Sequence, residues 1–82
     1  MDAEQLNHWH DVIIKKIEHI ENSGNGAQIH EVRHHKNMIV GYHSLMNAEL
    51  TNPLNFHPVE YYAKNLEDAL NDGEKYLSGL GA

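Results

Sequence analysis

The sequence contains no cysteine, so no disulfide can stabilise the fold and no thiolate can bind a metal. It also lacks any apolar run that approaches the roughly 20 residues of a membrane-spanning helix. Residues 1–7 have neither the basic start nor the apolar stretch of a signal peptide. We therefore expect a protein that makes no contact with membranes and remains in the cytoplasm.

Basic residues are scarce as well. Six Lys and Arg face twelve Asp and Glu, which gives a formal net charge of -6. Binding to nucleic acid depends on clustered cations that contact phosphates, so we expect no direct contact with DNA or RNA. Residues 1–26 and 51–82 hold five acids each, whereas residues 27–50 hold two acids and two bases. Two acidic thirds therefore flank a neutral middle third.

The length of 82 residues and a hydrophobic content of 40% predict one folded domain that spans residues 1–82. A core of this size contributes only about 3 to 5 kcal/mol without a disulfide or a metal. We therefore expect the domain to be completed by self-association into a homo-oligomer or by a partner.

Apolar residues at helical spacing predict the first and third helices, over about residues 2–22 and 58–78. In the first segment the buried stripe is expected to hold Leu6, Trp9, Ile13, Ile17 and Ile20. In the third segment it is expected to hold Val59, Tyr62, Leu66, Ala69, Leu70, Gly73, Leu77 and Leu80.

The middle segment, about residues 27–50, allows two interpretations. A hairpin could pair residues 38–40 with residues 28–33 across a turn at Lys36-Asn37. Helical spacing fits better, because it accounts for a longer stripe made of Ile29, Val32, Met38, Ile39, Tyr42, Leu45 and Met46. Gly41 would then mark a close helix contact or a bend. The predicted fold is all-α, a small three-helix bundle with up-down-up topology.

Eight histidines are the clearest excess in the composition. His30 and His34 are four residues apart, so on a helix both imidazoles would lie on one face. They supply two ligands, whereas a zinc site needs three or four, so we expect no firm metal site. The alternative is a small ligand or a divalent metal held at a subunit interface by His30, His34 and Tyr42. A histidine-rich middle helix could also sense pH.

No arrangement of side chains indicates catalysis. The two mid-chain serines, Ser23 and Ser44, do not lie in a Gly-x-Ser-x-Gly elbow, and no cysteine is present to act as a nucleophile. The segment Gly24-Asn25-Gly26 lacks the spacing and the lysine of a phosphate loop. We expect a binding protein rather than an enzyme, without a cofactor.

The predicted binding surface is helix three with the loop before it. Tyr62 belongs to the predicted buried stripe, and adjacent residues on a helix point in different directions, so we expect Tyr61 to be turned away from the core. Tyrosine is common at binding hot spots. Acidic residues of the same region could steer a basic partner. The candidate partner-binding residues are Phe56, His57, Glu60, Tyr61, Glu67 and Asp68. The sequence therefore predicts a small acidic module that regulates or inhibits a protein partner.

Overall fold

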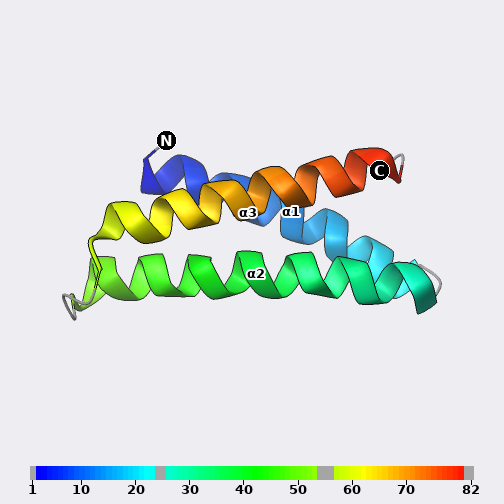
Figure 1. The fold of residues 1–82 in the computed structure, drawn as a ribbon, viewed down its shortest axis with the longest axis horizontal. Helices are drawn as coiled ribbons and strands as arrows, with labels where there is room; N and C mark the ends of the chain where they lie inside the picture. Colours follow the sequence, from blue (N-terminus) through cyan, green and yellow to red (C-terminus); the bar gives the residue numbers. More distant parts are fainter. Residues whose placement is uncertain (1, 24–25, 54–56, 81–82) are drawn as a thin grey trace.

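The computed structural model describes residues 2–23, 26–53 and 57–80. It contains α1 (Ala3–Ser23), α2 (Gly26–Thr51) and α3 (Val59–Gly79). Successive helices run in opposite directions and form an elongated bundle of 41 × 20 × 15 Å (Figure 1). The prediction of an all-α three-helix bundle is confirmed, with each helix end within one residue of its predicted position. None of the described helices is both long enough and apolar enough to cross a bilayer.

Short-range hydrogen bonds fix where α1 begins. The backbone N–H of Gln5 donates to the Asp2 carboxylate at 2.8 Å, and the Asp2 N–H donates back to the Gln5 side-chain oxygen at 3.1 Å. This reciprocal pair is a capping box, which satisfies donors that the first helical turn leaves free. Asp2 therefore lies at the start of α1, as an N-cap residue.

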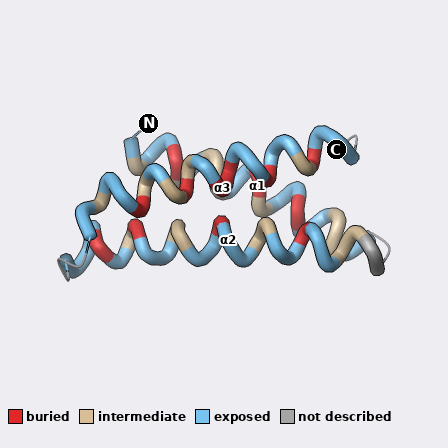
Figure 2. Tube along the Cα trace, viewed as in Figure 1, coloured by how far each residue is buried: buried red, intermediate tan, exposed pale blue. Residues whose placement is uncertain are grey.

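The core lies along the axis of the bundle, where all three helices contribute buried apolar side chains (Figure 2). α2 is continuous from residue 26 to residue 51, so the hairpin alternative for the middle segment is wrong. The buried apolar residues are Leu6, Ile13, Ile17, Val32, Ile39, Met46, Tyr62, Leu66, Ala69, Leu70 and Leu77.

Two residues assigned to the buried stripe of α2 lie outside the core. Met38 is 42% exposed and Leu45 is 48% exposed, so their predicted burial is wrong. The physical reason is that α1 and α3 bury the row of Val32, Ile39 and Met46, and Met38 and Leu45 lie outside that row. α2 thus carries apolar residues on a second side that no other helix of this chain covers.

The predicted close contact at Gly41 is also wrong, because a Cβ added there would meet no atom within 4 Å. The glycine at a close approach is Gly73 in α3. A Cβ at Gly73 would lie 3.1 Å from Cδ1 of Ile39. The missing side chain of Gly73 therefore lets α3 approach α2.

Candidate functional site

The first turn of α3 presents an aromatic side chain to solvent. Tyr61 is 46% exposed, whereas its neighbour Tyr62 is buried. The imidazole of His57 stacks on the Tyr61 ring, with ring centroids 4.2 Å apart and planes 19° apart. This contact braces the exposed ring, so less side-chain freedom remains to be lost when a partner binds.

Charged side chains surround Tyr61 on the next turns of α3. Glu60, Tyr61, Lys64 and Asp68 line a shallow hollow of about 380 Å³, together with Pro58 and Asn65. We call His57, Glu60, Tyr61, Lys64 and Asp68 the Tyr61 patch. Within the described part of the chain, neither Glu60 nor Asp68 forms an ion pair. Both carboxylates are exposed and available to an external cation.

Two predicted partner-binding residues are not part of this patch. Glu67 is only partly exposed and does not line the hollow, because its position on the helix turns it toward the flank of α3. Phe56 lies outside the described residues. The structure therefore brings together four of the six predicted residues, namely His57, Glu60, Tyr61 and Asp68.

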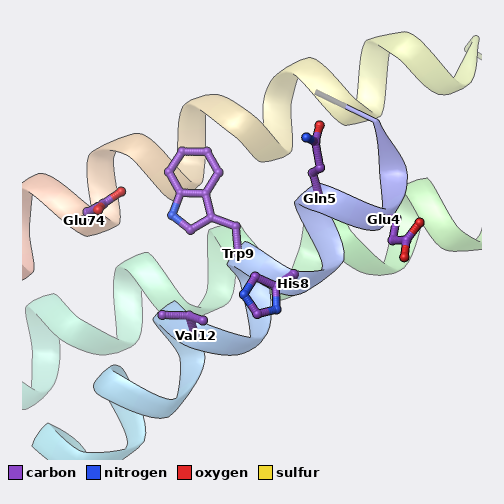
Figure 3. Close-up of a pocket in the computed structure, with 6 residues that line it drawn as sticks. All are labelled: Glu4, Gln5, His8, Trp9, Val12 and Glu74. Atoms are coloured by element: carbon purple, nitrogen blue, oxygen red, sulfur yellow. The ribbon is translucent and has the colours of Figure 1, made fainter.

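A larger hollow, which the sequence did not predict, lies between α1 and α3. Its volume is about 650 Å³, and its lining residues are Glu4, Gln5, His8, Trp9, Val12 and Glu74. Figure 3 shows the Trp9 indole reaching from α1 across to α3, with Val12 one turn further along α1. The helical spacing predicts a buried Trp9, but its side chain is only partly buried and packs against the core. The feature of the sequence that could have indicated this hollow is Val12, an apolar residue outside the predicted buried stripe of the first helix.

The histidine pair considered for a metal lies on the N-terminal half of α2. His30 and His34 are both exposed. With about 1.5 Å of rise per residue, Tyr42 lies roughly 12 Å from His34 and 18 Å from His30 along the axis of α2. Across residues 2–23, 26–53 and 57–80, no three His, Asp or Glu side chains gather so that they could hold a metal ion. A site shared between subunits stays a prediction.

A polar cluster that the sequence did not predict lies between α1 and α2, around His10 and His43. Nε2 of His43 lies 2.7 Å from Oδ1 of Asn7, and Nδ2 of Asn47 donates to the carbonyl of His43 at 3.1 Å. Burial, and then the charge of His10, lowers the pKa of His43. A hydrogen bond from His10 lowers the pKa of Asp11. The cluster is a structural contact between two helices.

Another histidine, His35, packs between α2 and α3. His35 stacks on the Tyr76 ring with centroids 4.9 Å apart. Burial lowers the pKa of His35. Burial also raises the pKa of Tyr76, and the nearby Glu31 raises it further. The Tyr76 hydroxyl is buried and makes no hydrogen bond of standard geometry with the described residues. These groups lie within the helix packing rather than in an open cleft.

Comparison of the chain with protein-family models, with curated proteins and with solved structures finds no match.

Proposed function

We propose that this chain is a small acidic protein-binding module that recognises a basic surface of a protein partner through the Tyr61 patch. The observation that carries the proposal is the exposed Tyr61 ring, stacked on His57 and flanked by two carboxylates that form no ion pair with the residues that the structure describes. Tyrosine combines a large apolar ring with a hydroxyl group, which makes it effective at the centre of an interface.

The charges of α3 support a basic partner. The helix carries five acids and two lysines, and the whole chain carries a net charge of -6. A field of this sign accelerates the approach of a cationic surface and repels acidic ones. The partner class proposed is therefore a protein with Lys and Arg around a small apolar contact that fits against Tyr61.

Binding would act by occupying the partner's surface. The Tyr61 patch is shallow and open, so it suits a protein surface better than an enclosed small molecule. An acidic module that covers a basic surface competes with the partner's other anionic ligands. On this basis we propose a regulatory or inhibitory role.

The test compares single substitutions by isothermal titration calorimetry against the partner captured from the host. We expect Tyr61→Ala to weaken binding by at least tenfold, because truncation of a hot-spot tyrosine costs about 2 kcal/mol or more. Lys75→Ala, an exposed change further along α3, should leave the affinity within twofold. Equal affinities for wild type and Tyr61→Ala would reject the proposed site.

A further inference from the structure

α2 contains a stretch with no formal charge. From Asn37 to Ala48 there is no Asp, Glu, Lys or Arg, although charged residues make up 22% of the sequence. The charged residues of α2 lie toward its two ends, with Glu31, Arg33 and Lys36 on one side and Glu49 on the other.

The same stretch exposes apolar side chains on the side turned away from the other two helices. Met38 and Leu45 are 42% and 48% exposed, and Gly41 between them is open. Asn37, Met38, Gly41, Tyr42 and Leu45 line a shallow hollow of about 280 Å³. Figure 2 shows the buried residues of α2 on the side that faces α1 and α3, with exposed residues along the opposite side.

The spacing on this side is that of a helix-pairing seam. Met38, Gly41, Leu45 and the exposed Ala48 follow one another at steps of three, four and three residues. This is the a/d pattern of helices that pack knobs into holes. The large residues would act as knobs, and the open backbone at Gly41 would provide a hole. We call Met38, Gly41, Leu45 and Ala48 the outer face of α2.

We propose that the outer face of α2 binds the same face of a second copy of this chain, in an antiparallel two-fold arrangement centred near Gly41. A two-fold contact requires one patch to be complementary to itself. An apolar patch without formal charge meets this condition, whereas two copies of an acidic surface repel each other. With a net charge of -6 on each copy, self-association is favoured where the contacting surfaces carry no acids.

The charges at the ends of α2 favour the antiparallel direction. In a parallel pair, Glu31 of one copy would lie beside Glu31 of the other. In an antiparallel pair centred near residue 41, the Glu31 side chains of the two copies lie far apart, toward opposite ends of the contact. Antiparallel helix dipoles also attract each other.

The size of the contact predicts a weak dimer. It uses one helix from each copy, so it lies at or below the lower end of specific interfaces, which bury about 1,200 to 2,000 Å² in total. We therefore expect a dissociation constant in the micromolar range and a mass that depends on concentration. Salt should strengthen the dimer, because it screens repulsion between two acidic chains.

The test is sedimentation equilibrium of the full chain over protein concentrations of about 5 to 500 µM, a range centred on micromolar affinity. We expect the weight-average mass to rise from 9.4 kDa toward twice that value. Leu45→Glu, and independently Met38→Glu, should weaken the dimer at least tenfold. Both side chains are exposed, so unchanged circular dichroism is expected for each variant.

Val12→Glu is the matched control, since it adds the same charge at an apolar residue of α1 that is 39% exposed. It should dimerise as wild type does. A wild-type chain that stays monomeric over this range would overturn the proposal. So would a dimer that Val12→Glu disrupts while Leu45→Glu and Met38→Glu leave it intact.

The direction of pairing is tested with cysteines, because the native chain has none. Met38→Cys and Leu45→Cys chains are mixed under mild oxidation. An antiparallel seam should give mostly mixed disulfides between position 38 of one copy and position 45 of the other. A preference for disulfides between identical positions would contradict the antiparallel arrangement.

Discussion

The imidazole rings of His10 and His43 stack face to face between α1 and α2, with centroids 3.7 Å apart and planes 9° apart. Nε2 of His43 also lies 2.7 Å from Oδ1 of Asn7 and 3.1 Å from Nδ2 of Asn47. Two protonated imidazoles at this distance would repel each other, so acid disfavours the stacked contact. The stack therefore links the stability of the bundle to pH.

We expect the bundle to lose stability as the pH falls below the ordinary histidine value of about 6.5. Burial lowers the pKa of His43 and of His35 in the folded chain. Unfolded chains then bind more protons than folded chains below that pH, so acid favours unfolding. The melting temperature, followed by circular dichroism between pH 7.5 and 5.5, should fall progressively.

His43→Gln isolates the contribution of this residue, since glutamine keeps a polar side chain but does not titrate. The variant should melt at a lower temperature at pH 7.5, because the loss of a hydrogen bond between partly buried groups costs about 1 kcal/mol. Its melting temperature should then depend less on pH than that of wild type. His8→Ala, an exposed residue of α1, serves as the control and should follow the wild-type curve. An identical slope for His43→Gln and wild type would exclude His43 as a source of the effect.

Gly41 and Gly73 should respond in opposite ways to added side chains. Gly41→Ala meets open space and should stabilise the monomer by up to about 1 kcal/mol, the difference in helix propensity. At Gly73 a new Cβ would press on Ile39, so Gly73→Ala should gain less and Gly73→Val should lose about 1 to 3 kcal/mol. Urea unfolding at low protein concentration measures all three, and a stable Gly73→Val variant would contradict the close approach of α3 to α2.

Glu21 joins the end of α1 to the start of α2. Its carboxylate accepts hydrogen bonds from Nζ of Lys36 at 2.8 Å and from Nε of Arg33 at 3.2 Å. The hydrogen bonds from Lys36 and then Arg33 lower the pKa of Glu21. This stabilisation is present above the ordinary Glu pKa and is lost as the pH falls through the lowered value.

We expect Glu21→Gln to lower the melting temperature at pH 7 in low salt. Because salt screens exposed ion pairs, the difference from wild type should shrink in about 1 M NaCl. Glu18→Gln, on an exposed site of the same helix, removes the same charge without breaking a described ion pair. A Glu18→Gln variant as unstable as Glu21→Gln would show that net charge, rather than this contact, causes the loss.

Helical periodicity was enough to predict the three helices, because apolar residues recur at helical spacing along each of them. It could not predict which side of α2 is buried. Met38 and Ile39 are adjacent and both apolar, and only the positions of α1 and α3 decide that Ile39 is covered. Sequence spacing within one helix does not specify where its neighbours lie.

The candidate site could be predicted only in part, because spacing places residues on one helix but does not specify contacts between side chains. Tyr61 could be placed outside the core because Tyr62 occupies the buried register. The stacking of His57 on Tyr61 and the hollow beside Trp9 depend on side-chain directions and on packing between helices. Neither follows from residue type and spacing, so both needed the three-dimensional arrangement.

The most direct measurement is photo-cross-linking in the host cell, with a benzophenone amino acid placed at position 61, 12 or 45 in three separate chains. We expect a partner protein to be captured from position 61, and a second copy of the chain from position 45. Position 12 lies on a different surface and should capture neither. Capture of the same partner from position 12, with none from position 61, would contradict binding through the Tyr61 patch.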